Sequence, residues 1–265
     1  MLFFDIETIP SLRSLAVPYP AAERHPPEGM SHADTLIQWR CDDEAAWREE
    51  WRKEASLSPR LGRVLCMGLA VDDEPVQVVY AYTEDQEREV LQAFWAAAER
   101  ADGQLCGFNS RPFDVPFVLV RSAIQDVLPR VPPPVVRDWM RTSLRSQYHL
   151  DLREGLTGGL KFAKGKLDDW AKFFGGEGKM EGFSGKDVLD AFLRGEHEKI
   201  IAYQIPDVEA TRFVHDRVRS FFGLSQPVLD VVRVGPVTSV AARSAGMSPV
   251  HSLASASEAA ASLAL

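Results

Sequence analysis

The order of apolar segments along the chain restricts the fold more than any other feature. An apolar run at Met1–Asp5 ends in an acid, and two further apolar runs, Arg63–Asp72 and Val76–Ala81, flank a short polar turn. Apolar residues then recur with helical spacing over Thr83–Arg100, and Gln104–Phe108 again has the composition of a short strand. We therefore predict an α/β fold that starts with an antiparallel meander and continues with alternating helices and strands.

The second half of the chain continues this alternation. It predicts one strand, at Tyr148–Leu152, and four helices, at Asp114–Ile124, Lys166–Phe174, Lys186–Leu193 and from about Glu196 to Arg219. Past Gly223 the composition shifts toward Ser and Ala, and the final segment has no strong apolar periodicity. We expect a domain over residues 1–222 and a C-terminal tail over 223–265, to which the sequence assigns no function.

A long segment separates the first two predicted strands. Residues 10–30 hold several prolines and predict an irregular excursion, whereas Ser31–Asp34 resembles a capping box and Asp42–Ser56 has strong helical composition. Trp47 and Trp51 lie four residues apart and share one helical face. The sequence predicts a helical insertion, over about residues 10–60, that packs its tryptophans on the core.

Composition and charge exclude several classes of protein. The net charge of −8 argues against a protein that coats nucleic acid electrostatically, although bound cations give a carboxylate site its own attraction for phosphate. No apolar run approaches the roughly 20 residues that span a bilayer, and acids occur where a signal peptide would be basic and apolar. The three cysteines form no paired motif, and Cys66 and Cys106 lie in apolar runs, as small buried residues do. We expect a cytoplasmic protein without a membrane partner.

Two acids directly follow the first apolar run. Asp5 and Glu7 are two residues apart, so in a strand their carboxylates point to the same face. Two like charges this close are unfavourable unless a cation lies between them, and a hard divalent ion prefers such oxygen ligands. A solvated surface pair is the alternative that this short motif leaves open.

Two other acids begin or interrupt predicted helices. Asp114 follows the strand and turn of Gly107–Asn109, where it could equally serve as an ordinary helix N-cap. Asp207 lies four residues after Tyr203, so their side chains would share one helical face. Because Pro206 lacks a backbone donor, we predict that one helix ends near Tyr203 and another begins near Asp207.

Taken in order, these segments resemble a known superfamily. FDIET (Phe4–Thr8), GFNSRPFD (Gly107–Asp114) and YQIPD (Tyr203–Asp207) resemble the three motifs of the DEDD exonucleases, and the third has the form of the tyrosine subtype. The chain looks most like predicted 3′→5′ exonucleases related to the proofreading domain of family-B DNA polymerases, over roughly residues 1–220. The resemblance implies an RNase H-like fold, a mixed sheet of about five strands flanked by helices.

The resemblance also implies a mechanism and a set of site residues. The metal ligands would be Asp5, Glu7, Asp114 and Asp207, which would hold two divalent cations, Mg²⁺ or Mn²⁺. Tyr203 would aim the attacking water, and a phenol of ordinary pKa is protonated at neutral pH. Thr8, Ile9 and Asn109 would contact the terminal nucleotide, although Asn109 could instead satisfy local backbone.

The implied substrate is the 3′ end of single-stranded nucleic acid, with DNA favoured and 5′-mononucleotides as products. One stretch between residues 153 and 186 is rich in basic residues and glycine, and either tracks a phosphate backbone or forms a solvated surface with its interleaved acids. Its basic residues are Arg153, Lys161, Lys164, Lys166, Lys172, Lys179 and Lys186. Phe162 and Phe183 would either stack on bases or belong to the core.

Two alternatives remain open at the level of sequence. A 3′→5′ exoribonuclease of the same superfamily would differ only in accepting a 2′-hydroxyl, which no residue here decides. A catalytically silent module that binds nucleic acid or a polymerase has Pro206 and the insertion as its support. A partner in DNA replication or repair is compatible with all of these readings, but the sequence does not identify one.

Overall fold

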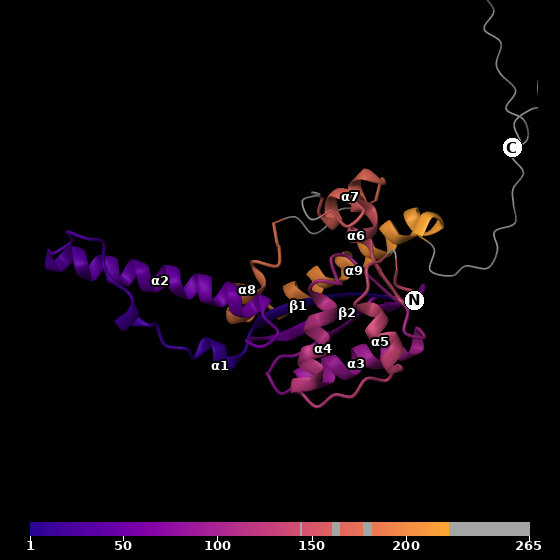
Figure 1. Ribbon diagram of the computed structural model, residues 1–265, viewed down its shortest axis with the longest axis horizontal. Helices are drawn as coiled ribbons and strands as arrows, with labels where there is room; N and C mark the ends of the chain where they lie inside the picture. Colours follow the sequence, from indigo (N-terminus) through magenta and orange to yellow (C-terminus); the bar gives the residue numbers. More distant parts are fainter. Residues whose placement is uncertain (144, 161–164, 177–181, 223–265) are drawn as a thin grey trace, which may run out of the picture. The chain divides into compact units, whose positions relative to one another are not determined.

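A five-stranded mixed sheet organises the chain in the computed structural model, which describes residues 1–143, 145–160, 165–176 and 182–222 (Figure 1). The strands lie in the order β3-β2-β1-β4-β5. Their bounds are Leu2–Pro10 for β1, Gly62–Val71 for β2, Gln77–Tyr80 for β3, Leu105–Gly107 for β4 and His149–Asp151 for β5. The predicted α/β class and the number of strands are confirmed.

The central strand β1 has different neighbours on its two edges. It is antiparallel to β2 along its whole length, from Leu2 opposite Val71 to Pro10 opposite Gly62. Its parallel pairing with β4 involves only Leu2 and Phe3. Beyond Phe3, the edge of β1 that faces β4 has no strand beside it, so its backbone groups must find other hydrogen-bond partners there.

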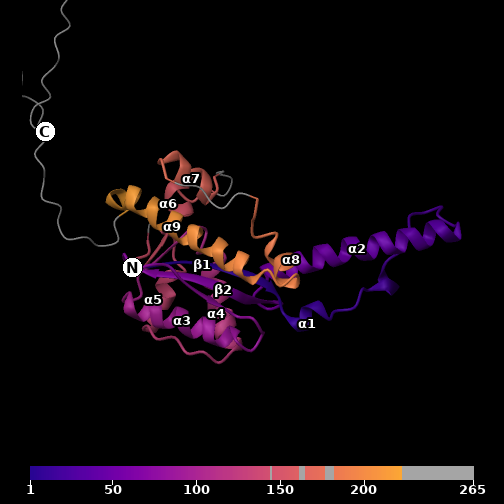
Figure 2. The same cartoon turned by 180° about the vertical axis from the view of Figure 1, so that it is seen from behind.

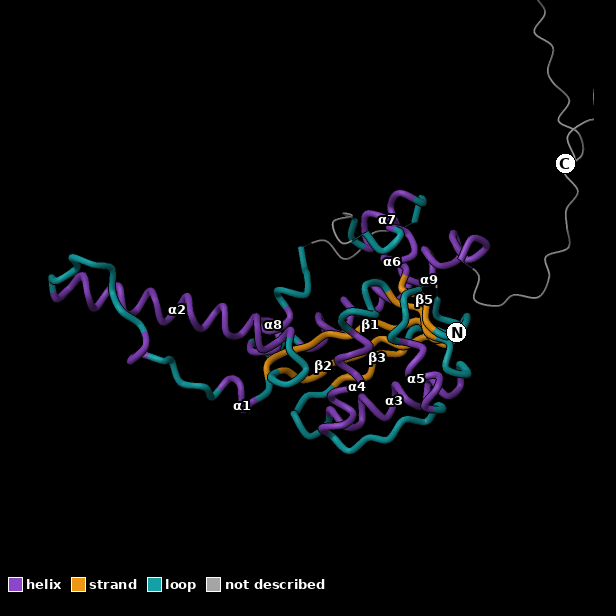
Figure 3. The backbone as a smooth tube through the Cα atoms, viewed as in Figure 1, coloured by secondary structure: helices purple, strands orange, loops and turns teal. Residues whose placement is uncertain are grey.

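Helices cover both faces of the sheet. Figures 1 and 2 show α3 (Glu87–Arg100), α4 (Asp114–Ile124) and α5 (Pro133–Trp139) on one side of β1 and β2. On the other side lie α6 (Leu152–Thr157), α7 (Leu167–Phe173) and α9 (His197–Phe222). The tube view separates the strands from these two helical layers (Figure 3).

The alternation of side chains along β1 explains why two hydrophobic cores exist. Leu2, Phe4 and Ile6 point toward the layer of α3 and α4, where they join the largest buried cluster. Phe3 points to the other face and packs in a second cluster with residues of α9. Asp5 and Glu7 follow Phe3 on that face, so the strand presents its two acids toward α9.

The insertion between β1 and β2 is more helical than predicted. It contains α1 (Leu12–Leu15), the 3-10 turn η1 (Ala21–Glu23) and the 25-residue helix α2 (Ala33–Leu57). The helix includes the predicted Asp42–Ser56 and begins earlier, at Ala33, whereas the predicted capping box at Ser31–Asp34 was wrong. His32 occupies the N-cap position without a side-chain cap bond, so Ser31 lies one residue too early to cap the helix.

The tryptophans of α2 do not pack on the domain core. Trp47 and Trp51 stack on one another with ring centroids 5.8 Å apart, so the prediction that they share a face was right. Their neighbours, however, are in the preceding segment: Trp47 meets the ring of Tyr19, and Trp51 Nε1 donates to the carbonyl of Ser14. Only Ala55 of α2 is buried, because the helix meets the sheet only through its last turns.

The remaining expectations about single elements have mixed outcomes. Cys66 and Cys106 are buried free cysteines, as predicted, and Cys41 is exposed. The short helices α5 and α6 were not predicted.

Within the described part of the chain, no helix combines the length and the apolar character needed to cross a membrane. The tail over residues 223–265 lies outside the described residues.

Pro206 does not divide the last helix, contrary to the prediction. α9 runs without interruption from His197 to Phe222, with Pro206 inside it. Tyr203 and Asp207, on either side of the proline, are buried against the sheet, whereas Pro206 is only half-buried. The carbonyl that loses its helical donor belongs to Ala202, an exposed residue, so water can take the place of the missing bond.

We expect Pro206→Ala to stabilise the protein, because it restores that hydrogen bond at a position that is not fully buried. The gain in the free energy of unfolding should be about 2 kcal/mol, the helix penalty of proline less its effect on the unfolded chain. Urea unfolding followed by circular dichroism measures it. Unchanged or lower stability would mean that α9 is bent around Pro206 in a way that alanine does not reproduce.

Candidate active site

Three carboxylates converge between β1 and α9. Oxygen atoms of Asp5, Glu7 and Asp207 all lie within 4.8 Å of one another. Asp207 is buried, and the two acids of β1 are half-buried. The register of β1 and β2 shifts between Glu7 and Thr8, which marks an irregularity directly after the second acid. The structure thus brings together three of the four acids predicted as metal ligands.

A glycine makes this convergence possible. Gly68 of β2 lies opposite Asp5, and a Cβ atom there would approach Val208 Cγ2 to 2.6 Å and Gln204 Cγ to 2.9 Å. Such contacts are shorter than real Cβ atoms tolerate, so any larger residue would force α9 away from the sheet. Without a side chain at position 68, the helix lies low enough for Asp207 to reach the acids of β1.

Asp114 reaches the same strand from the opposite layer. It opens α4, and its Oδ1 accepts a hydrogen bond of 3.3 Å from the backbone N–H of Ile6, between Asp5 and Glu7. That N–H lies on the stretch of β1 that β4 no longer covers. Asp114 is outside the group of three converging acids but adjoins it, and burial, with Asp5 nearby, raises its pKa well above the usual range for a carboxyl.

The combined site has the donor chemistry of a divalent cation site. Its four carboxylates are crowded together and buried or half-buried, and neighbouring negative charges disfavour one another's ionised form. A hard cation with oxygen ligands would reverse that penalty, and carboxylates are the ligands that Mg²⁺ and Mn²⁺ accept. The four acids therefore fit the cations that the sequence predicts.

Tyr203 lies one turn before Asp207 on the same face of α9. Its side chain is buried, packs edge-on against the ring of Phe183 and lies close to Asp207. Burial, followed by the negative charge of Asp207, raises the pKa of the phenol, so Tyr203 is protonated at neutral pH. Such a group can orient a water molecule but does not act as a base.

Gln204 is a site residue that sequence reasoning missed. It is fully buried, and its Nε2 donates to Asp5 Oδ2 at 2.9 Å, while its Oε1 lies 3.8 Å from the Sγ of Cys66. The amide therefore links α9 to Asp5 and orients one carboxylate of the cluster. The available signal was its place inside YQIPD, where a buried polar residue needs a polar partner.

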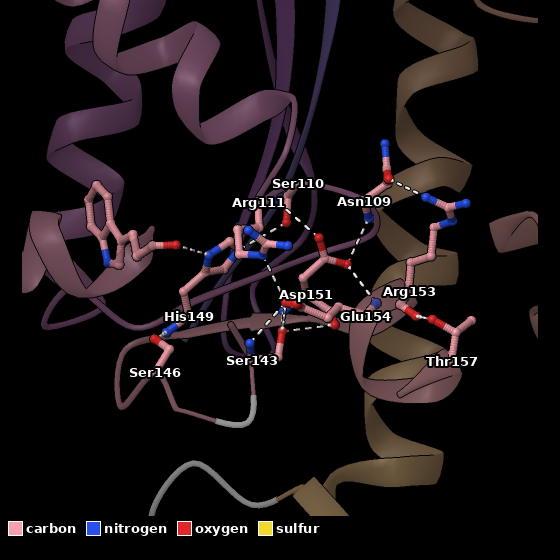
Figure 4. A network of polar contacts seen from close by, with 11 residues as sticks. Asn109, Ser110, Arg111, Ser143, Ser146, His149, Asp151, Arg153, Glu154 and Thr157 are labelled. Carbon is pink, nitrogen blue, oxygen red and sulfur yellow. Dashed lines mark hydrogen bonds and ion pairs between the residues drawn. The ribbon is translucent and has the colours of Figure 1, made fainter. Parts of the chain in front are cut away.

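A second polar network holds the segment that leads to Asp114 (Figure 4). Asp151, at the end of β5, accepts hydrogen bonds from the backbone N–H groups of Asn109, Arg111 and Glu154. Asn109 has a left-handed backbone with φ of 64°. Asp151 thus closes the turn between β4 and α4 and caps α6.

His149 supports the same turn through a hydrogen bond with Ser110. Its Nδ1 is 2.8 Å from the carbonyl oxygen of Trp139, so Nδ1 donates and Nε2 accepts from the hydroxyl of Ser110, 2.9 Å away. Burial lowers the pKa of His149, in keeping with a neutral ring. This histidine is structural, since one ring nitrogen bonds Ser110 in the β4–α4 turn and the other bonds the carbonyl of Trp139 in α5.

The three residues predicted to contact the nucleotide lie in different surroundings. Thr8 donates through Oγ1 to the carbonyl of Ser56 and is partly exposed. Ile9 is buried in a hydrophobic cluster with Leu65 and Tyr203. Asn109 accepts from Arg153 through its side-chain oxygen at 2.7 Å and borders a cavity of about 240 Å³. Their contacts with substrate stay predictions.

The basic stretch is only partly described. Lys161, Phe162, Lys164 and Lys179 lie outside the described residues. Lys166, Lys172 and Lys186 are exposed, and Lys172 pairs with Asp168 on its own helix. Of the two predicted aromatics, Phe183 belongs to the core, where it packs on Tyr203 and lies beneath the ammonium group of Lys199.

Comparisons with known proteins find a matching family. The protein family described as predicted 3′-5′ exonucleases related to the exonuclease domain of PolB matches residues 59–227. The match includes Asp114, Tyr203 and Asp207 and begins after β1, so the structure, and not the match, connects Asp5 and Glu7 to them. No match is found among curated proteins.

A solved structure supports the fold. The family B DNA polymerase of the hyperthermophilic archaeon Pyrobaculum calidifontis is similar with a TM-score of 0.51 and 18% sequence identity. The similarity covers 82% of this chain and 24% of the polymerase chain, so this chain spans about a quarter of that length. At this identity the likeness shows the fold alone, and it agrees with the predicted RNase H-like sheet.

We expect Gln204→Leu to release Asp5 from its buried donor. A hydrogen bond to a charged group contributes about 1.5–3 kcal/mol, so Gln204→Leu and Asp5→Asn should show a coupling energy of that order in a double-mutant cycle. Urea unfolding in EDTA measures all four proteins. Additive effects of the two substitutions would show that the amide does not hold Asp5.

We also expect Asp151→Ala to destabilise the protein by about 2–3 kcal/mol, because three backbone donors lose their acceptor at once. Asp42→Ala is the matched control, since Asp42 is an exposed aspartate whose side chain accepts only from Gln38. Its effect should remain below about 0.5 kcal/mol. Equal effects of the two substitutions in thermal unfolding would contradict a clamp by Asp151.

Proposed function

Since the chain belongs to the family of predicted 3′-5′ exonucleases related to the exonuclease domain of PolB, we propose that it hydrolyses the terminal phosphodiester at the 3′ end of single-stranded nucleic acid. DNA is the favoured substrate and 5′-mononucleotides are the products. The observation that carries this proposal is the convergence of Asp5 and Glu7, from the first strand, with Asp207, from α9, beside the buried Asp114.

Two divalent cations, Mg²⁺ or Mn²⁺, are part of the proposal. Asp5, Glu7, Asp114 and Asp207 would hold them. Bound there, such ions supply Lewis acidity, which acidifies coordinated water and neutralises charge on phosphate oxygens. The buried amide of Gln204 and the backbone N–H of Ile6 each fix one carboxylate, so two of the ligands are oriented before a cation arrives.

Tyr203 is proposed to position the attacking water. Its phenol keeps its proton at neutral pH and lies beside Asp207, so its hydroxyl can hold a water molecule by hydrogen bonding. The rigid contact with Phe183 limits the positions that this hydroxyl can take. Tyr203→Phe should therefore reduce turnover while cation binding persists.

The structure weakens the case for a catalytically silent module. That alternative had Pro206 as one of its two supports, because a broken helix would have displaced Tyr203 from Asp207. α9 is continuous, and both side chains are buried on its sheet-facing side. The second candidate is the exoribonuclease. No described residue favours a 2′-hydroxyl, so the comparison of DNA with RNA in the substrate test decides between the two.

We expect Asp207→Asn to abolish the activity and weaken cation binding. The assay uses 5′-labelled single-stranded DNA and RNA of matched sequence with Mn²⁺ or with EDTA, and the products form a ladder that shortens from the 3′ end. Loss of an essential charge should lower turnover by about 10²–10³-fold or more. Exposed Asp85→Asn, on the β3–α3 connection, is the control and should retain activity.

Thermal unfolding in the presence of Mn²⁺ separates the possible outcomes. Binding to the native protein alone raises the melting temperature, and this shift should disappear in Asp207→Asn. Cleavage without a 3′ ladder, or a ladder that persists in EDTA, would refute the proposed reaction. Cation binding without cleavage of either strand would refute the substrate and leave only the metal site.

A further inference from the structure

A groove opens beside the converging carboxylates. It lies between α2 and the segment that contains α8 (Val188–Leu193), and α8 lies near the end of α2 closest to the sheet in Figures 1 and 2. The groove encloses about 760 Å³. Thr8 lines it directly after Glu7, and a Cβ atom at Gly185, another lining residue, would lie 3.6 Å from Glu7 Oε2. The groove therefore starts at the candidate active site.

One face of α2 forms a wall of this groove. Six lining residues recur at helical spacing: Ala45, Arg48, Glu49, Arg52, Lys53 and Ser56. They cover roughly 16 Å of helix at 1.5 Å per residue. The aromatic face of the same helix, with Trp47 and Trp51, is held by the segment around Ser14 and Tyr19. This packing on the back of α2 leaves the other face open to a ligand.

The charge of the groove is opposite to that of the whole chain. Four cationic side chains, of Arg48, Arg52, Lys53 and Lys186, line it against two anionic ones, of Glu49 and Asp190, whereas the net charge of the protein is −8. Arg48 is paired with Glu44. Among the described residues, Arg52, Lys53 and Lys186 are exposed and take part in no ion pair, so their charges remain available to a ligand.

From this we propose that α2 and the segment 185–190 bind the phosphodiester backbone of the single strand whose 3′ end lies at the carboxylates. The proposal rests on the proposed function and adds to it the path of the substrate. Lysine and arginine would meet phosphates, and exposed Leu57 with half-buried Leu189 would meet bases. Because the family match begins at residue 59, α2 lies outside it, and this wall is specific to the insertion.

The test compares two triple variants that lose equal charge. The groove variant carries Arg52→Gln, Lys53→Gln and Lys186→Gln. The control variant carries Arg137→Gln, Arg145→Gln and Arg217→Gln, at three exposed positions that do not line the groove. Glutamine retains helix propensity, and circular dichroism checks that both proteins fold. Both variants, and a reference protein without them, carry Asp207→Asn to prevent hydrolysis.

Fluorescence anisotropy with 5′-labelled dT20 and rU20, in Mg²⁺ at several salt concentrations, gives the dissociation constants. For three lost phosphate contacts, the slope of log affinity against log salt should become shallower by about 2 in the groove variant, and affinity at 0.1 M salt should fall at least about 10-fold. The control should match the reference. The two oligonucleotides show whether the groove distinguishes DNA from RNA.

The outcomes separate this proposal from the proposed activity. Loss of binding confined to the groove variant supports the groove, even if the parent protein shows no exonuclease ladder. Equal affinities and salt slopes for the groove variant and the reference would refute it, even if that ladder is present. An equal loss in the control would attribute the effect to net charge and overturn the proposal, as would a reference protein that binds neither oligonucleotide.

Discussion

The close approach of α9 to the β1–β2 pair is the contact on which the site depends. Gly68 permits this approach, and Val208 and Gln204 occupy the space that a side chain at position 68 would need. The approach places Asp207 among the acids of β1, at an electrostatic cost, since carboxylates this close repel each other. A cation bound there, as proposed, would offset that cost and so stabilise the close packing of α9 on the sheet.

The position of the fourth acid, Asp114, depends on a different interaction. β4 ends early, which leaves the N–H of Ile6 without a strand partner, and Asp114 fills that vacancy with a carboxylate oxygen. Its position is determined by the β4–α4 turn, which Asp151 closes through backbone hydrogen bonds and His149 supports through Ser110. Buried polar groups of this kind must all be satisfied, so the turn has few alternative conformations.

The insertion between β1 and β2 differs from the rest of the domain in how little its long helix is buried. α2 contributes one buried residue to a fold whose other long helices bury many, so the hydrophobic effect alone gives little reason for its length. Its aromatic rings hold the preceding segment, and its charged face borders the groove at Thr8. A helix anchored mainly at one end, beside the acids, is well placed to contact a long substrate.

The sequence by itself determined the layered α/β class, the acids and their order, because periodicity and motif spacing are local properties of the chain. It did not determine the role of Gln204 or of Asp151, since each acts on a residue distant in the chain. The sequence misjudged Pro206, because local propensity favoured a break, whereas burial on both sides of the proline keeps α9 whole. It placed the tryptophans of α2 on the core for a similar reason: periodicity shows that two side chains share a face, but only tertiary structure decides what that face meets.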